Sequence, residues 1–266
     1  MIYCDTHCHL DFDDFDKDRE AVLERAQKAG LAFLINPGID LASSEAACSL
    51  AASWPKLVYA ACGFHPHDSS GFDPETSLSQ LEYLARNPGV VAIGEIGLDY
   101  YRDRSPRPVQ RQVFAAQLEL AVKLDMPVIL HNREADADML AMLLDWHASL
   151  PAESRLAQDP GVLHAYAGSL SMAQALAPKG FCFGIGGPLT YTNADERRWI
   201  TAGIPLNRLL LETDAPFLTP QPNRGKRNEP AYIPVVAEVL ADLHEKSAEE
   251  IGAVTTANAK RLFRLA

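Results

Sequence analysis

Short apolar runs alternate along this chain with longer segments in which apolar residues recur at helical spacing. Such runs, bounded by glycine, proline and polar residues, predict strands, and the longer segments predict amphipathic helices. Eight strands are expected, over Ile2–Asp5, Leu31–Asn36, Leu57–Cys62, Val90–Glu95, Pro127–His131, Val162–His164, Phe181–Gly184 and Arg208–Thr213. A helical segment follows each strand, which is typical of βαβ units with parallel strands.

The predicted helices share this position between strands, except for an additional one at the C-terminus. They cover Asp16–Gly30, Leu41–Ser53, Ser77–Asn87, Pro108–Leu124, Ala135–Ser149, Leu170–Ala177, Ala194–Ala202, Tyr232–Glu245 and Ala248–Leu265. Eight strand–helix units in about 250 residues are the size of a (β/α)8 barrel. An open, doubly wound parallel sheet is the alternative fold.

Six potential metal ligands decide between these folds, because they fall at or just past the ends of the apolar runs. They are His7, His9, Glu95, His131, His164 and Asp214, which follow the first, fourth, fifth, sixth and eighth strands. Only a closed barrel brings those five strand ends to one rim. We therefore expect an α/β fold, a TIM barrel formed by a single domain over residues 1–266, with the extra C-terminal helix outside the eight units.

The spacing of these residues fits metal binding. His7 and His9 are two residues apart, so on an extended strand both imidazoles share a face and can hold one ion. Glu95 offers two oxygens and could bridge two ions about 3.5–4 Å apart, although a strand-end salt bridge is the alternative. Asp214 could bind metal, orient the attacking water or accept its proton. Asp5 is expected to support the ligands rather than join them.

Other polar residues near this rim are candidates for holding a substrate. His65, in the His65-Pro66-His67 loop, is expected to donate to a phosphate oxygen or to developing charge, unless the loop is merely polar. Arg133, Arg224 and Lys226 are the expected substrate contacts because arginine forks and lysine charges fit phosphate. Arg224 and Lys226 form a basic cluster with Arg227 after the eighth strand. A second cluster follows the fourth strand and consists of Arg102, Arg104, Arg107 and Arg111; the alternative role of both clusters is a solvated surface. The glycines of Gly184–Gly187 would let backbone N–H groups approach a phosphate.

Composition limits the possible partners and compartment. The formal net charge of -11 argues against a non-specific nucleic-acid coat, but bound metal ions would add local positive charge. Five cysteines without a C-x-x-C pair favour a reducing compartment. The chain shows neither a signal-peptide pattern nor an apolar run of roughly 18 residues. We therefore expect a cytoplasmic monomer that does not associate with membranes.

Seven motifs together identify a known family. They are Asp5–Leu10, Gly63–His67, Gly94–Asp99, Leu130–Arg133, Leu211–Pro216, Gly225–Pro230 and Thr255–Phe263. With these motifs the chain resembles the TatD-type metal-dependent deoxyribonucleases, within the amidohydrolase-like barrels. Two local departures are the long polar stretch Ser149–Gly161 and Tyr166, where phenylalanine is common in the family.

The resemblance implies a centre of one to three metal ions and hydrolysis of DNA phosphodiester bonds, often as a 3′–5′ exonuclease. It implies that His7, His9, Glu95 and Asp214 hold one ion and that Glu95, His131 and His164 hold a second. Asp214, Glu95 and His65 are then the expected catalytic residues, with DNA ends as substrate.

Two other functions stay open at this point. An amidohydrolase-type enzyme could cleave a small amide, lactone or ester, but many such enzymes bridge their metals with a modified lysine, whereas the fourth strand offers Glu95. A non-catalytic metal-binding protein is the third possibility, although no ligand is missing. Two divalent ions are expected, Mg²⁺, Mn²⁺ or Zn²⁺. Four imidazoles favour zinc, manganese, cobalt or iron over magnesium by ligand type.

Overall fold

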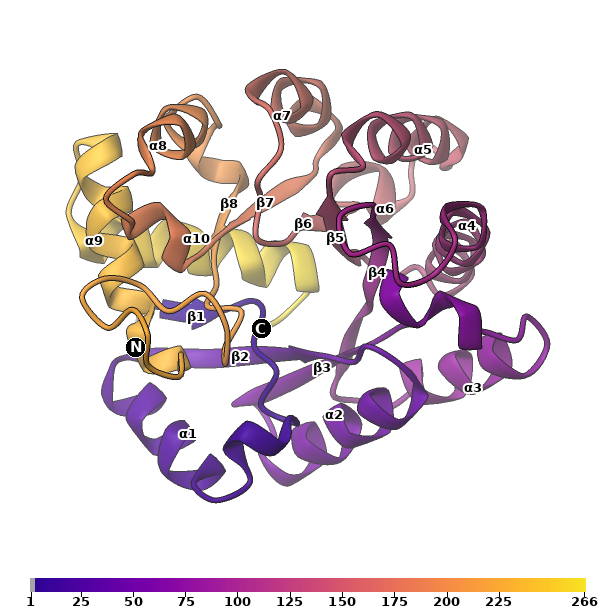
Figure 1. Cartoon of the computed structure of the whole chain (residues 1–266), viewed down its shortest axis with the longest axis horizontal. Coiled ribbons are helices and arrows are strands. Elements are labelled where there is room, and N and C mark those ends of the chain that lie inside the picture. The colour runs from indigo at the N-terminus through magenta and orange to yellow at the C-terminus, as the bar shows by residue number, and fades with distance from the viewer. Residues whose placement is uncertain (1–2) are drawn as a thin grey trace.

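Eight parallel strands form the centre of the computed structural model, which describes residues 3–266 (Figure 1). Their order in the sheet is their order in the chain, β1 to β8. The strands are β1 (Tyr3–Asp5), β2 (Leu31–Pro37), β3 (Val58–Cys62), β4 (Val90–Asp99), β5 (Val128–Arg133), β6 (Gly161–Leu163), β7 (Cys182–Ile185) and β8 (Leu209–Leu211). The predicted strands are thus confirmed with shifted ends; Ile2, in the first of them, lies outside the described residues.

The sheet closes on itself between β1 and β8. The Thr6 N–H donates to the Leu211 carbonyl (3.0 Å), and Cys8 forms a parallel bridge with Ala215. Two more backbone bonds continue this seam, from the Asp214 N–H to the His7 carbonyl (2.8 Å) and from the His9 N–H to the Ala215 carbonyl (2.7 Å). The predicted (β/α)8 barrel is therefore confirmed, and its closure joins the segments that carry three of the candidate ligands.

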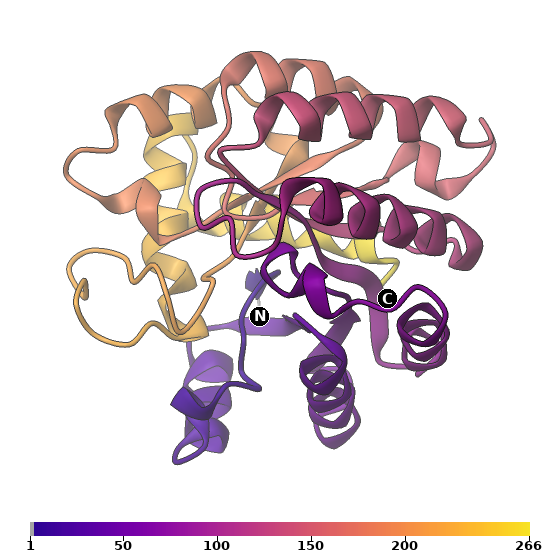
Figure 2. The ribbon, with the colours of Figure 1, turned by 45° about the vertical axis from the view of Figure 1, so that its right-hand side comes forward.

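Helices surround the strands in both views (Figures 1 and 2). They are α1 (Arg19–Lys28), α2 (Leu41–Ser53), α3 (Thr76–Ala85), α4 (Arg107–Leu124), α5 (Asp136–Ser149), α6 (Arg155–Gln158), α7 (Leu170–Leu176), α8 (Asp195–Ala202), α9 (Ile233–His244) and α10 (Ala248–Phe263). Only the four-residue α6 has no counterpart in the prediction, because one turn inside a polar stretch leaves no helical period to detect. Short 3₁₀ helices occupy several loops, η2 (Pro66–Gly71) and η4 (Gly187–Thr190) among them.

The core has two parts, and the C-terminal helix belongs to the inner one. Most buried apolar residues fill the layer between strands and helices. A smaller cluster contains inward-facing residues from all eight strands, such as Cys4, Ile129 and Leu210, packed against Leu262 and Phe263 of α10. α10 thus covers the barrel interior, where the sequence had indicated only a helix outside the eight units.

One strand departs from its predicted course at a functional residue. β4 was expected to end at Glu95 but continues to Asp99, with an irregular register against β5 between Ile93 and Ile96. Further along, Gly97 has φ +143° and lies so close to β5 that a Cβ atom there would meet the His131 carbonyl oxygen at 2.0 Å. Glu95 therefore projects from within a strand, at an irregularity that changes which way its side chain points.

Candidate metal centre

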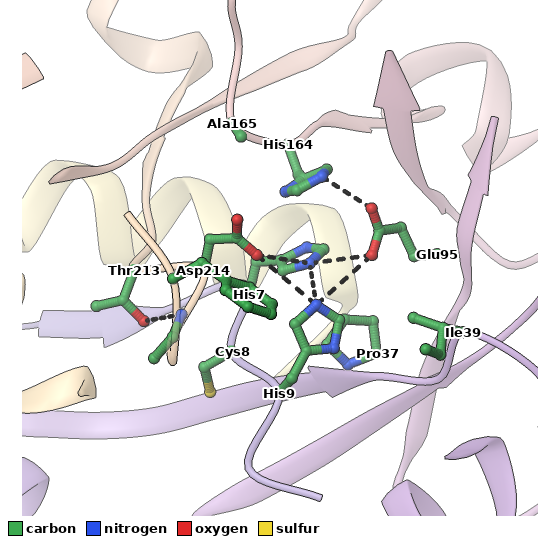
Figure 3. Close-up of polar contacts among 12 residues, drawn as sticks. His7, Cys8, His9, Pro37, Ile39, Glu95, His164, Ala165, Thr213 and Asp214 are labelled. Atoms are coloured by element: carbon green, nitrogen blue, oxygen red, sulfur yellow. Dashed lines mark hydrogen bonds and ion pairs between the residues drawn. The ribbon is translucent and has the colours of Figure 1, made fainter. Parts of the chain in front are cut away.

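All six candidate ligands lie together at the carboxyl ends of the strands. His7 and His9 follow β1, Glu95 lies in β4 and His131 in β5. His164 follows β6 directly, and the remaining carboxylate, Asp214, lies three residues beyond β8. Figure 3 shows His7, His9, Glu95, His164 and Asp214 pointing toward one another from these separate elements.

The first group of donor atoms surrounds one oxygen of Glu95. Its Oε2 lies 3.3 Å from His7 Nε2 and 3.6 Å from His9 Nε2. The two imidazole nitrogens are 3.2 Å apart, and Asp214 Oδ1 is 3.8 and 3.7 Å from them. Asp214 has φ +57°, in the left-handed region where aspartate is one of the commoner non-glycine residues. That conformation, together with the bond from its N–H to His7, places its carboxylate beside the two histidines.

The second group surrounds the other oxygen of the same carboxylate. Glu95 Oε1 lies 2.9 Å from His131 Nδ1 and 2.9 Å from His164 Nε2, and these nitrogens are 3.3 Å apart. Glu95 therefore faces one set of donors with each oxygen, which is the arrangement of a carboxylate shared between two ions.

The donor atoms fit divalent metal ions. Ligands about 2.0–2.1 Å from a tetrahedral ion lie roughly 3.3 Å from one another, close to the separations in both groups. The imidazoles of His7, His9 and His164 are buried, and their Nδ1 atoms have no hydrogen-bond partner among residues 3–266. The Nε2 atoms of the same rings face Glu95 at 3.3, 3.6 and 2.9 Å, so their lone pairs converge on carboxylate oxygens in a buried place, where a cation between them would remove the repulsion.

Burial and crowding shift the protonation of these groups. Burial, helped by the neighbouring His164, lowers the pKa of His7 well below its ordinary value. Burial also acts to lower the pKa of His164, but the Glu95 carboxylate outweighs it and raises that pKa to about 10. The imidazoles of His164, His65 and His7 outweigh burial at Glu95 and hold its pKa well below the usual range. Glu95 is therefore ionised, which is the form that binds metal.

A residue that the sequence analysis missed orients His131. The Asp99 carboxylate, at the end of β4, accepts from His131 Nε2 (3.2 Å) and from His67 Nε2 (2.8 Å). The Asp99 Oδ1 atom also accepts the Arg102 N–H (2.7 Å), so its position is fixed. A proton on His131 Nε2 leaves the Nδ1 lone pair free to face Glu95. The signal was present in the Gly94–Asp99 motif, but sequence spacing did not show which atom Asp99 would contact.

A second missed residue is Glu212. It is buried, accepts the Ala165 N–H, and has Oε1 3.8 Å from His164 Nδ1. Burial raises the pKa of Glu212 to about 8. Asp5 behaves as expected of a supporting residue, because it accepts from the His7 N–H (3.1 Å) and the Thr213 N–H (3.0 Å) and binds no imidazole.

His65 faces the second group, and its proton can be assigned. Its Nδ1 accepts the His67 N–H (3.1 Å), so in the neutral ring the proton is on Nε2, 3.5 Å from Glu95 Oε1. Burial lowers the pKa of His65 well below its ordinary value, which keeps the ring neutral. His65 therefore presents an N–H donor to the site rather than a lone pair.

The three predicted substrate contacts are exposed. Arg133 lies at the end of β5, and Arg224 and Lys226 lie in the loop between β8 and α9. Arg133 stacks over the Tyr101 ring, with 3.9 Å from its guanidinium carbon to the ring centroid, and Arg224 over Tyr191 at 4.3 Å. Lys226 is exposed in the same loop as Arg224. None of these three charges is engaged in an ion pair with the described residues.

Several other residues of the predicted basic clusters form ion pairs within the protein, so fewer of these charges are available to a substrate. Arg111 pairs with Asp138 (3.1 Å), and Arg107 pairs with Asp103 (3.5 Å). Arg227 forms a two-pronged pair with Asp18, whereas Arg102 and Arg104 are exposed.

The glycines at the end of β7 and just after it also serve internal packing. A Cβ on Gly184 would meet Glu212 Oε2 at 2.0 Å, and one on Gly187 would meet the Leu218 carbonyl oxygen at 1.9 Å. The close approach made possible by these glycines is therefore to the β8 segment, where the sequence had suggested a phosphate.

A (β/α)8 barrel with this donor set at its carboxyl ends is the architecture of metal-dependent hydrolases. The family model described as "TatD related DNase" matches residues 4–264, so the chain belongs to the TatD-related DNase family. The resemblance found in the sequence motifs is thereby confirmed.

Individual relatives agree over their whole length. The chain is 40% identical over 261 residues to the "Uncharacterized metal-dependent hydrolase YabD" of Bacillus subtilis, covering 98% of each chain. It is 39% identical over 270 residues to the "3'-5' ssDNA/RNA exonuclease TatD" of Erwinia billingiae, again covering 98% of each. Among solved structures, the TatD homologue YjjV of Escherichia coli superposes with a TM-score of 0.90 at 36% identity, covering 100% of both chains.

Proposed function

We propose that this protein is a metal-dependent nuclease that hydrolyses phosphodiester bonds of DNA, removing nucleotides from the 3′ end. The single observation that supports this most is the placement of Glu95, with one oxygen facing each group of donor atoms. Family membership and the relative named as a 3′–5′ ssDNA/RNA exonuclease support the substrate class.

The six ligands divide between two ions in this proposal. His7, His9, Glu95 and Asp214 would hold one, and Glu95, His131 and His164 the other. When bound, such ions lower the pKa of a water ligand and stabilise negative charge on phosphate oxygens. Mg²⁺, Mn²⁺ and Zn²⁺ are the candidates, and imidazole-rich ligation favours the latter two.

The protein's own side chains would supply the remaining chemistry. Asp214 has a side chain 15% exposed, against 4% for Glu95, so it is the carboxylate best placed to accept the proton of the attacking water. His65 would donate its Nε2 proton in a hydrogen bond to a phosphate oxygen, and Arg133, Arg224 and Lys226 would hold the strand.

The alternatives are less well supported. An amidohydrolase acting on a small amide, lactone or ester would share the barrel, but the shared ligand here is a glutamate, and the comparisons favour nucleic acid. A non-catalytic metal-binding protein would not need an uncoordinated N–H donor such as His65 facing the shared carboxylate.

We further infer that residues 1–266 form one domain and that the protein is a cytoplasmic monomer. All eight strands contribute to one barrel, which supports the single domain. The five cysteines without a C-x-x-C pair support a reducing compartment. No helix within residues 3–266 is long and apolar enough to cross a membrane. Light scattering on the purified protein tests the monomer.

The decisive experiment is digestion of end-labelled single-stranded DNA, duplex DNA and RNA by metal-stripped protein with each metal added back. We expect metal-dependent shortening from the 3′ end, and Asp214→Asn to lose several orders of magnitude in rate while keeping its circular dichroism spectrum. Cleavage of esters or amides without cleavage of nucleic acid would overturn the proposal. Near-normal turnover by Asp214→Asn would overturn the role given to Asp214.

A further inference from the structure

Two large apolar side chains remain exposed next to the metal centre. Phe217 is 52% exposed and Leu218 37%, and they follow Asp214 by only three and four residues. Removing an aromatic ring from water is favourable, so an exposed ring at the mouth of a binding site marks a place where a ligand can cover it.

The backbone that positions Asp214 also fixes Phe217. The Phe217 N–H donates to the Asp214 carbonyl (2.8 Å), and the Phe217 carbonyl accepts from Asn228 Nδ2 (2.6 Å). Asn228 is fully buried and also donates to the Thr213 carbonyl (2.9 Å). Leu218 has φ +54°, a conformation that side chains of its kind seldom adopt. The ring is thus held at the surface by a backbone bonded on both sides.

A second aromatic ring connects Phe217 to the candidate ligands. Phe12 stacks on His9 with ring centroids 4.6 Å apart and planes 17° from parallel. Phe12 and Phe217 meet edge to face at 6.1 Å and 71°. Phe12 and Phe217, here called the aromatic shelf, therefore extend without interruption from a candidate metal ligand to solvent.

Cationic side chains lie in the neighbouring loops. Arg224 belongs to the same β8–α9 segment as Phe217 and stacks on Tyr191, whereas Arg133 stacks on the exposed Tyr101 across the mouth. Proteins that bind single-stranded nucleic acid combine aromatic faces that stack on bases with cations that follow the backbone. The exposed ring and the nearby charges have this combination, and Phe12 links the ring to the candidate ligand His9.

We propose that the aromatic shelf is a binding subsite for the nucleobase at the 3′ end of the strand, with Phe217 as the ring on which that base stacks. This inference rests on the proposed function, because it takes a nucleic-acid strand as substrate. Every base has an aromatic face, so the subsite would favour a terminal base over a bare sugar without selecting one base sequence.

The test compares two oligonucleotides that differ only at the nucleotide at the 3′ end. One carries 2-aminopurine there, a base whose fluorescence falls when it stacks, and the other carries an abasic sugar. A phosphorothioate at the last linkage slows cleavage, so binding to the metal-loaded protein can be measured. The variants are Phe217→Ala and Phe217→Trp. Tyr83→Ala is the matched control, because Tyr83 is 75% exposed near the C-terminal end of α3, toward the opposite end of the barrel.

We expect Phe217→Ala to weaken binding of the strand with a terminal base by roughly tenfold and to abolish the fluorescence loss. Binding of the abasic strand should change less than twofold, Phe217→Trp should restore both signals, and Tyr83→Ala should behave as the wild type. Equal losses on both strands, or quenching that survives in Phe217→Ala, would overturn the inference.

Cleavage of an unmodified strand by the wild-type protein tests the proposed nuclease function separately from the proposed stacking subsite. If the strand is cut normally but the quenching does not depend on Phe217, the proposed nuclease function is supported and the proposed stacking subsite is wrong. Phe217-dependent quenching without cleavage under any metal overturns the nuclease and leaves the stacking subsite supported.

Discussion

Two charged clusters flank the segment that follows β8, and they balance their charges in opposite ways. In the metal centre, imidazole nitrogens and carboxylate oxygens approach one another with too few protons between them. In the other, here called the ion-pair cluster, Asp18 and Glu229 meet Arg25 and Arg227. Arg25 contacts Glu229 at 2.6 Å, and Arg227 contacts both oxygens of Asp18 at 2.8 Å.

The difference lies in the donors. Each guanidinium of the ion-pair cluster carries hydrogens that match carboxylate oxygens, so this cluster is satisfied by the chain alone and ties α1 to the β8–α9 segment. The metal centre gathers acceptors and lone pairs in a buried place, where they repel unless protons or cations lie between them. Without its ions such a site destabilises the folded protein through this repulsion. Because bound ions remove the repulsion, the site binds them.

The largest effect is expected where one carboxylate serves both groups. Glu95→Gln removes the charge that faces five imidazoles. We therefore expect the rate to fall about a thousandfold or more, beyond the ten- to hundredfold loss typical when a residue that only supports a ligand is changed. Metal content measured by mass spectrometry should fall with it. Glu82→Gln, which alters an exposed ion pair with Lys123, is the control and should leave both unchanged.

A smaller loss is expected from the residue that orients His131. Asp99→Asn removes the negative charge that holds the His131 Nε2 proton, and we expect metal affinity or kcat/KM to fall ten- to a hundredfold. Isothermal titration with Mn²⁺ or Zn²⁺ measures the first. Asp73→Asn, at an exposed turn before α3, should have no effect. Unchanged affinity and turnover in Asp99→Asn would show that His131 needs no such partner.

Metal binding should stabilise the fold by a measurable amount. An ion present at a hundred times its Kd adds about 2.7 kcal/mol to the free energy of unfolding. For a domain of 266 residues that corresponds to a rise in Tm of roughly 5 °C by calorimetry. The rise should be smaller in His131→Ala, which loses a ligand of the second ion only. A wild-type Tm that does not respond to any divalent ion would remove the contrast between the two clusters.

The smallest effect is expected from the ion-pair cluster. The hydrogen bonds from Arg227 lower the pKa of Asp18 to about 2. A carboxyl group whose pKa is lowered by folding stabilises the fold fully at a pH above its ordinary pKa near 4. This stabilisation is lost as the pH falls through the lowered pKa of about 2. Because Asp18 is 35% exposed, solvent screens the pair, and Asp18→Asn should cost only about 0.2–1 kcal/mol at pH 7. Urea unfolding should show this difference disappearing below pH 2.

Much of the site was predictable because parallel strands carry their carboxyl-end residues to one rim. The alternation of apolar runs and helical segments gave the eight strands in order, and α2 matches its predicted range, Leu41–Ser53. The position of His7, His9 and His164 just past strands then sufficed to bring them together. Their roles as ligands remain part of the proposal.

Other features depended on contacts between distant residues. The irregular register of β4 aims Glu95 into the site, and Asp99, Glu212 and the barrel-covering face of α10 acquire their roles through neighbours remote in sequence. Local periodicity fixes which residues form strands and helices, because it depends on neighbours within a few positions. Which atom of a side chain meets which partner was decided only by closure and register, which the tertiary structure sets.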